Sequence, residues 1–213
     1  MTVVGIVGNA PGHHSDLKTY KEEVDFWIGA DRGAWVLATC DLPITYAIGD
    51  FDSTTKEEKL LIDKHAQCVH VYPSEKDETD LELALNKAYE LEPDTIYLFG
   101  VSGGRKDHEF INVQLLYAIL SKGIRGIIID IANYLELTFP GKYTVLHDIN
   151  YPIISFVPFS KEVKGITLTH FYYPLTNANI SWGSTLCISN KLIRNSGTFS
   201  YKEGILLLVK SRD

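Results

Sequence analysis

Short apolar runs alternate with helical patterns over about the first 131 residues. The runs are rich in β-branched residues and end at Gly, Asp or Pro, which is typical of buried strands. The expected strands are Val3–Val7, Phe26–Ile28, Thr45–Ile48, Cys68–Val71, Thr95–Phe99 and Gly126–Asp130. Between them, segments 55–65, 80–90 and 107–121 repeat apolar residues at helical spacing. The alternation predicts an α/β fold, with a mainly parallel, Rossmann-like sheet and flanking helices.

The helical period disappears after Ile131, and Gly, Pro and Asn separate short β-rich segments. The expected strands here are Tyr134–Phe139, Tyr143–Leu146, Ile153–Val157, Gly165–Thr169, Thr185–Ile188, Lys191–Ile193, Thr198–Tyr201 and Ile205–Val209. This spacing favours a small antiparallel β-sandwich or barrel, and we expect the sandwich. We therefore expect two domains, residues 1–132 and 133–213.

Composition narrows the class of protein. The 213 residues include 20 Lys and Arg against 27 Asp and Glu, a net charge of −7, and 45% are hydrophobic. An acidic balance argues against nucleic-acid and membrane partners, which require an excess of basic residues. The cysteines, Cys40, Cys68 and Cys187, are scattered, and no apolar run approaches the ~18 residues that span a bilayer. We expect a cytoplasmic protein with reduced thiols.

Two aspartates follow the third expected strand in the sequence GDFDS, residues 49–53. In extended backbone, Asp50 and Asp52 point to the same side, so their carboxylates converge. A hard divalent cation is the natural partner for such a pair. The alternative interpretation is an acidic turn that caps the next helix.

A second acidic cluster, residues 74–80, follows the fourth expected strand. Thr79 with Glu82 is a capping-box pattern, which explains Thr79 structurally. Asp80 in the first helical turn would lie at the same sheet edge as Asp50 and complete a three-carboxylate metal site. Lys76 is suited to a phosphate, although a solvated loop lysine is the simpler interpretation.

The sequence GGRKDH, residues 103–108, joins the fifth strand to a helix. Paired glycines and a helix N-terminus favour anion binding, and Arg105 can hold phosphate oxygens bidentately. Asp107 is explained equally well as a helix cap. Asp31, in ADRG, follows the second strand. Together these strand ends place carboxylates and an arginine along one sheet edge, as phosphoryl transfer requires.

The ordered motifs ADRG, GDFDS, KDETD and GGRKDH, followed by a β-rich tail containing GSTLCISN, resemble the thiamine pyrophosphokinase family over nearly the whole chain. The resemblance implies an α/β catalytic domain that binds ATP and Mg²⁺, and a β-sandwich that binds thiamine and forms a homodimer. It implies transfer of a pyrophosphoryl group from MgATP to the hydroxyl of thiamine, giving thiamine diphosphate and AMP. The active sites would lie at the subunit interface.

The resemblance also assigns roles to single residues. Asp50, Asp52 and Asp80 would be the Mg²⁺ ligands, and together with Arg105 and Asp107 they form the expected catalytic set. The residues expected on the nucleotide and pyrophosphate side are Asp31, Lys76, Asp77, Thr79, Arg105 and Asp107. In the β-rich tail, Ser189 and Asn190 would approach thiamine.

Animal members of the family carry a tryptophan near the C-terminus that stacks on thiamine. The matching stretch here, residues 204–209, contains no aromatic residue. The resemblance therefore leaves three sources for the stacking surface: Trp182, Tyr201 or aliphatic contacts.

Besides a generic sugar or nucleotide transferase, which would use the same DxD metal site with a different acceptor, two other functions compete. The sequence DFDST, residues 50–54, also fits the DxDxT start of haloacid-dehalogenase phosphatases, where the first Asp is a nucleophile and the second an acid/base. That superfamily places the motif after its first core strand, whereas here it follows the third. The second alternative is a non-catalytic nucleotide- or thiamine-binding protein, which would form no AMP.

Overall fold

A computed structural model describes residues 1–10 and 16–213. The chain divides into two compact units, Met1–Ile131 and Ala132–Asp213, and each is described by itself. Across the described residues, every helix is too short or too polar to cross a membrane.

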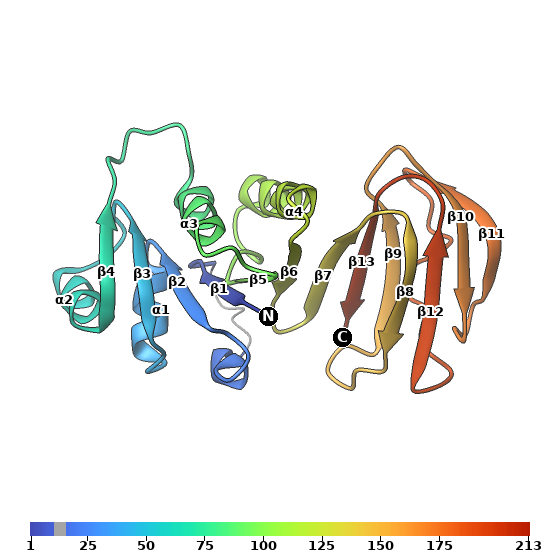
Figure 1. Cartoon of the computed structure of the whole chain (residues 1–213), viewed down its shortest axis with the longest axis horizontal. Coiled ribbons are helices and arrows are strands. Elements are labelled where there is room, and N and C mark those ends of the chain that lie inside the picture. The colour runs from blue at the N-terminus through green and yellow to red at the C-terminus, as the bar shows by residue number, and fades with distance from the viewer. Residues whose placement is uncertain (11–15) are drawn as a thin grey trace. The chain divides into compact units, whose positions relative to one another are not determined.

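The first unit is built on a six-stranded parallel sheet (Figure 1). Its strands are β1 (Val3–Val7), β2 (Phe26–Ala30), β3 (Ile44–Gly49), β4 (Ala66–Val71), β5 (Thr95–Phe99) and β6 (Arg125–Ile129). They lie in the order β4-β3-β2-β1-β5-β6. The chain order reverses direction at β1 and β5, so these two neighbours form the switch point of the sheet, where open α/β sheets bind ligands.

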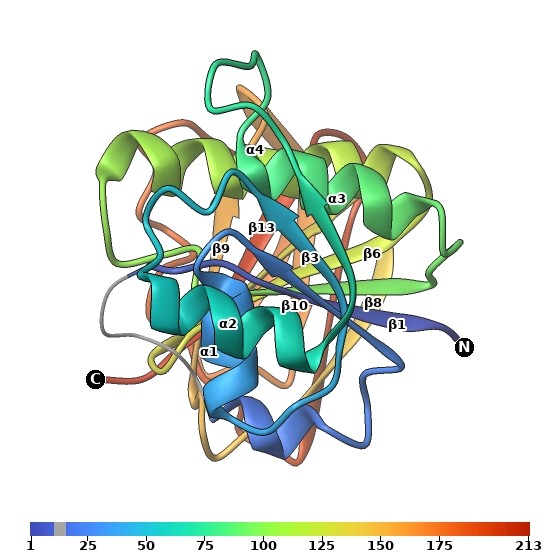
Figure 2. The same cartoon turned by 90° about the vertical axis from the view of Figure 1, so that its left-hand side faces the viewer.

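Helices cover both faces of this sheet. They are the 3-10 helix η1 (Leu17–Tyr20) and the α-helices α1 (Gly33–Thr39), α2 (Lys56–His65), α3 (Asp80–Tyr89) and α4 (Lys106–Ser121). Helices α1 and α2 lie on one face, and α3 and α4 lie on the other (Figures 1 and 2). The mainly parallel sheet with flanking helices that the alternating pattern predicts is confirmed.

The apolar runs form strands because both faces of the sheet are covered. Ile6, Ile28, Ile48 and Leu98 are at most 1% exposed. Strands β2 and β3 pair with Ala30 opposite Ile48, so the turns that follow them start at the same level of the sheet. The carboxyl ends of the strands consequently share one edge.

The second unit consists of antiparallel strands in two groups. One contains β7 (Asn133–Thr138), β13 (Leu206–Ser211) and β9 (Ile153–Pro158), paired in that order; the other contains β11 (Leu175–Ser181), β10 (Glu162–Thr169), β12 (Ser196–Tyr201) and β8 (Gly141–Leu146). Phe156 and Leu208 of the first group share a buried core with Ile166 and Phe199 of the second. The expected antiparallel β-sandwich is confirmed.

Three elements of the second unit differ from the sequence prediction. Residues 185–188 form turns, and residues 191–193 contribute only an isolated bridge between Leu192 and Phe171, so neither expected strand forms. Strand β11 forms although the sequence pattern does not predict it. Its pairing with β10 contains register shifts, and its residue Asn177 has a φ of 50°. Its polar, irregular sequence hides the period of two that identifies a strand.

Candidate active site

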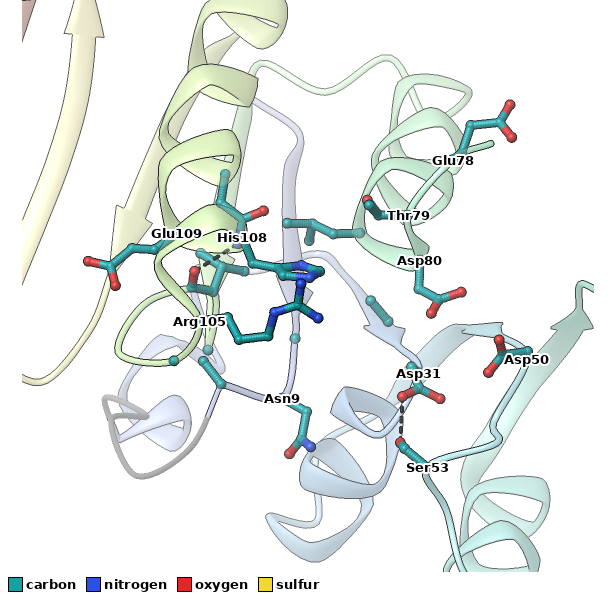
Figure 3. Close-up of a pocket in the computed structure, with 18 of the residues that line it drawn as sticks. Asn9, Asp31, Asp50, Ser53, Glu78, Thr79, Asp80, Arg105, His108 and Glu109 are labelled. Carbon is teal, nitrogen blue, oxygen red and sulfur yellow. Dashed lines mark hydrogen bonds between the residues drawn. The ribbon is translucent and has the colours of Figure 1, made fainter. Parts of the chain in front are cut away.

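The first unit contains a cavity of about 910 Å³ at the carboxyl edge of its sheet (Figure 3). Turns after β1, β2, β3, β4 and β5 all contribute to it. The lining polar residues are Asn9, Asp31, Asp50, Asp52, Ser53, Ser74, Lys76, Glu78, Thr79, Asp80, Arg105, His108, Glu109 and Asn112. The expectation that separate strand ends converge is met by these contacts.

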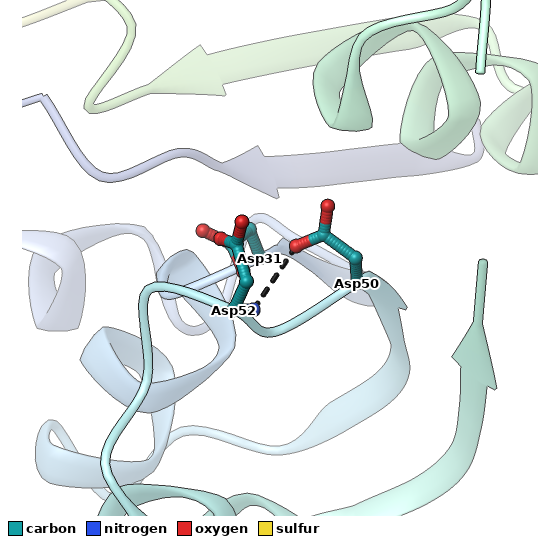
Figure 4. A group of neighbouring side chains, drawn as sticks. All are labelled: Asp31, Asp50 and Asp52. Atoms are coloured by element: carbon teal, nitrogen blue, oxygen red, sulfur yellow. Dashed lines mark hydrogen bonds between the residues drawn. The ribbon is translucent and has the colours of Figure 1, made fainter. Parts of the chain in front are cut away.

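Three carboxylates form the acidic wall of this cavity. Asp31, Asp50 and Asp52 each place an oxygen within 4.8 Å of the other two (Figure 4). Oδ1 of Asp50 accepts a hydrogen bond of 3.0 Å from the backbone N–H of Asp52, and Oδ2 of Asp31 accepts one of 2.6 Å from Ser53 Oγ. The three closest carboxylates are therefore those of Asp31, Asp50 and Asp52. The motifs instead predict Asp80 as the third member of this group.

The backbone explains why these side chains meet. Asp31 and Phe51 both lie in the left-handed region, with φ of 50° and 57°, which turns the chain sharply at the end of each strand. Phe51 is 6% exposed and anchors the GDFDS loop in the core, so its two flanking aspartates project outward. Gly49 is required because a Cβ there would lie 2.9 Å from the Cα of Asp31.

These residues fit a divalent cation. Among the described residues, Oδ1 of Asp31 is a buried oxygen that receives no hydrogen bond, which is unfavourable unless a ligand satisfies it. Three convergent carboxylates supply the hard oxygen ligands that Mg²⁺ prefers.

Lys76 lies against the acidic wall from the loop after β4. Its Nζ is 2.9 Å from Oδ1 of Asp80 and 3.6 Å from Oδ2 of Asp50, and it donates to the carbonyl of Pro73. The side chain is only 12% exposed. Lys76 therefore neutralises part of the charge that a cation would otherwise balance.

The crowded charges perturb the acidities in the cavity. The hydrogen bond from the Asp52 N–H lowers the pKa of Asp50, whereas repulsion from Asp50 raises the pKa of Asp52. Burial raises the pKa of Asp80 against the opposing effect of Lys76. For Lys76, burial lowers the pKa, but the contacts with Asp80 and Asp50 outweigh it and the net pKa is raised.

Arg105 places a positive charge on the opposite side of the cavity. Arg105 and His108 lie side by side, across the cavity from Asp31, Asp50 and Asp80, while Glu78 and Glu109 point away (Figure 3). Helix α4 begins after Arg105, whose side chain makes no capping hydrogen bond to the first turn. Exposed backbone N–H groups and a guanidinium at one place are suited to phosphate oxygens.

Two of the expected nucleotide-side residues do not line this cavity. Asp77 is exposed on the loop before α3, and Asp107 is 63% exposed and binds Arg105 instead. The hydrogen bond from Arg105 lowers the pKa of Asp107 to about 2. Thr79 lines the cavity while also capping α3 through the N–H of Glu82.

Sequence analysis missed Asn9 as a candidate. It lies in the turn after β1 and lines the cavity. The rule that identified the other turns, a polar residue directly after a buried strand, applies equally to residues 8–10. Ser53 belongs to the GDFDS motif, but its hydrogen bond to Asp31 forms only when the two turns come together in the fold.

The two residues expected near thiamine belong to the second unit. Asn190 is 2% exposed, and its side-chain amide pairs with the backbone N–H and C=O of Tyr173 at 3.0 and 2.8 Å. Ser189 is exposed, has a φ of 57°, and donates its N–H to Ser155 Oγ. Asn190 therefore shapes the backbone, and Ser189 is the accessible member of the pair.

The structure separates the two aromatic candidates for stacking. Tyr201 is 4% exposed, and its hydroxyl donates to the carbonyl of Thr138 inside the second unit. Trp182 is 68% exposed. Only Trp182 of these two presents a ring face to a ligand.

Comparisons with known proteins agree with this arrangement. Residues 17–128 match the family model for the thiamin pyrophosphokinase catalytic domain, and residues 142–206 match that for its vitamin B1 binding domain. Thiamine pyrophosphokinase of Bacillus subtilis is 45% identical over 214 residues, covering all of both chains.

Solved structures support the same relationship. The crystal structure of thiamine pyrophosphokinase from Bacillus subtilis has 43% identity and a TM-score of 0.94, and all of both chains is covered. That from Geobacillus thermodenitrificans has 44% identity and a TM-score of 0.90, with 100% of this chain and 98% of the other covered. The Candida albicans enzyme, at 17% identity and a TM-score of 0.84, shares the fold over 99% of this chain and 89% of its own. The chain belongs to the thiamine pyrophosphokinase family.

Proposed function

We propose that this chain transfers the pyrophosphoryl group of MgATP to the hydroxyl of thiamine. The thiamine oxygen forms a bond to the β-phosphorus, the bond between that phosphorus and the α,β-bridging oxygen breaks, and AMP leaves with this oxygen. The hydroxyl proton passes to solvent. The products are thiamine diphosphate and AMP.

The opposed walls of the cavity carry this proposal. Asp31, Asp50 and Asp52 converge on one side, and Arg105 lies with the N-terminus of α4 on the other. A triphosphate needs both a cation held by carboxylates and direct donors to its oxygens. The spacing of the two walls within one cavity allows a single nucleotide to use both.

Each residue then has a defined task. Asp31, Asp50 and Asp52 would hold the cation, and Asp80 would be a further ligand if Lys76 bound a phosphate oxygen instead. When bound, Mg²⁺ neutralises charge on the transferred group. Arg105 leaves Asp107 to donate to the same group, which is feasible because its side chain is 73% exposed. Before the nucleotide binds, Asp107 orients Arg105 through this ion pair.

Incubation of the purified protein with MgATP and thiamine, with and without EDTA, tests the reaction. Chromatography should show equal amounts of AMP and thiamine diphosphate, both abolished by EDTA. ADP with thiamine monophosphate would contradict pyrophosphoryl transfer. Phosphate release independent of thiamine would favour the phosphatase alternative, which the position of Asp50 after β3 does not support.

Further parts of the proposal concern the second unit and the assembly. We propose that Ser189 and Trp182 contact thiamine, because both are exposed within the unit that matches the vitamin B1 binding domain. The homodimer with sites at the subunit interface and the cytoplasmic location stay predictions. Crosslinking or sedimentation of the purified protein tests the dimer.

A further inference from the structure

An ion pair outside the carboxylate cluster joins the two turns that carry its aspartates. Arg32 donates to Oε1 of Glu58 from Nη2 at 2.6 Å and from Nε at 3.2 Å. The Glu58 side chain is 11% exposed and that of Arg32 36%. Partial burial reduces solvent screening, so this contact is stronger than an exposed ion pair.

Glu58 also fixes the end of the GDFDS loop. Its Oε2 accepts a hydrogen bond of 2.9 Å from the N–H of Thr55, while Thr55 Oγ1 accepts one of 3.2 Å from the N–H of Glu58. This capping box defines the first turn of α2, where the loop ends. The hydrogen bond from Thr55 is the main reason that the pKa of Glu58 is lowered, with Arg32 acting in the same direction.

Arg32 provides the corresponding anchor on the other turn. It follows Asp31 directly, and its guanidinium lies 4.8 Å from the ring centroid of Trp35 on α1. Asp31 accepts the N–H of Ala34 through its carbonyl, which ties its backbone to the same helix. The Arg32–Glu58 contact therefore links the turn of Asp31 to the loop of Asp50 and Asp52.

We propose that Arg32 and Glu58 are positioning residues that set the separation of Asp31 from Asp50 and Asp52, and thereby the affinity of the site for its divalent cation. The inference rests on the proposed function only in taking these carboxylates as the cation site. Neither residue lines the cavity, so both act through the aspartates.

Mn²⁺ binding to the nucleotide-free protein, followed by electron paramagnetic resonance, tests this role without turnover. Glu58→Gln keeps the capping box, since glutamine also serves at that position, but removes the charge that holds Arg32. The matched control is Glu90→Gln, which breaks another 2.6 Å ion pair, with Lys87, at the end of α3. Arg32→Met tests the contact from its other side and replaces Glu58→Gln if that variant does not fold.

We expect Glu58→Gln and Arg32→Met each to weaken Mn²⁺ binding about tenfold, and the double variant to lose little more. Arg32→Lys should restore only part of the affinity because it lacks the planar fork. The Mn²⁺ concentration for half-maximal activity should rise, while kcat at saturating Mn²⁺ recovers.

The outcomes distinguish the positioning role of Arg32 and Glu58 from the existence of the cation site. If folded Glu58→Gln and Arg32→Met proteins bind Mn²⁺ as tightly as Glu90→Gln and wild type, the positioning role is wrong while the cation site stands. If wild-type protein binds no Mn²⁺, the assignment of the cation site fails, and the positioning role fails with it.

Discussion

The ammonium of Lys76 lies 2.9 Å from Oδ1 of Asp80. The same nitrogen is 3.6 Å from Asp50, so one side chain balances two carboxylates of the acidic wall. A lysine in this position competes with a divalent cation for the same oxygens. The electrostatic state of the ligand-free site therefore depends on Lys76 as much as on the aspartates.

Replacing Lys76 by Met should strengthen Mn²⁺ binding in the absence of nucleotide, by about tenfold, because a competing positive charge is removed. The same variant should raise the KM for ATP. Lys87→Met, which removes a lysine from an ion pair on α3, is the matched control. Weaker Mn²⁺ binding in Lys76→Met, measured by electron paramagnetic resonance, would contradict the competition.

Asp52→Asn should lower kcat at least about 100-fold while the protein remains folded, since a cation ligand becomes neutral. Circular dichroism checks the fold and AMP formation measures the rate. Asp63→Asn on α2, whose carboxylate binds Lys59 at 3.2 Å outside the cavity, serves as control. Normal turnover by Asp52→Asn would remove it from the cation site.

Gly33→Ala should destabilise the first unit by about 3 kcal/mol, because an added Cβ would lie 1.8 Å from the carbonyl oxygen of Val7. The comparison is Gly123→Ala, where the new Cβ meets nothing within 4 Å and only the left-handed backbone at φ 78° opposes it. That change should cost about 1 kcal/mol. Urea unfolding of both variants would refute the packing argument if the order were reversed.

We expect Asp148 to contribute to the free energy of unfolding in a pH-dependent way. Burial raises its pKa, but hydrogen bonds from Lys210 and from the N–H groups of Asn150 and Tyr151 outweigh this, and the net pKa lies below the ordinary value. A depressed folded-state pKa stabilises the protein above the unfolded pKa of about 4, and the effect is lost as the pH falls through the folded value.

Asp148→Asn should therefore reduce the free energy of unfolding by about 1 kcal/mol at pH 7. The difference from wild type should shrink as the pH falls below about 4, where the unfolded carboxyl becomes protonated, and disappear as the pH falls through the lower folded-state pKa. Urea titrations at several pH values measure it. A difference that is independent of pH would show that the hydrogen-bond geometry, rather than the charge, matters.

The sequence predicted the strands of the first unit closely because most of them are short apolar runs buried on both faces, whereas the edge strand β4 is largely exposed. It also predicted which turns meet, since parallel strands share one edge. It did not predict that Asp31 lies closer to Asp50 and Asp52 than Asp80 does. That choice depends on the left-handed backbone of Asp31, which is a property of the folded turn.

The strands of the second unit were harder to predict from the sequence, for physical reasons. Residues 185–188 have high strand propensity, yet the chain turns on either side, at Gly183 and Ser189 with φ of 81° and 57°. Cys187 accepts one backbone hydrogen bond from Phe156 of β9, and the segment forms no strand. The polar edge strand β11 forms because β10 offers it backbone partners. Whether a strand forms at either place depends on pairing between segments that are distant in the sequence, and the local pattern of residues says little about such pairing.

The pairing of Ala30 with Ile48 has a consequence for ligand binding. Adjacent strands lie about 4.8 Å apart, and this spacing fixes how far apart the two aspartate-bearing turns begin. Folding has therefore already removed most of the conformational entropy that binding would otherwise cost. Buried residues such as Ile48 therefore contribute to the site from a distance: a core substitution that shifts this pairing should reduce activity together with stability.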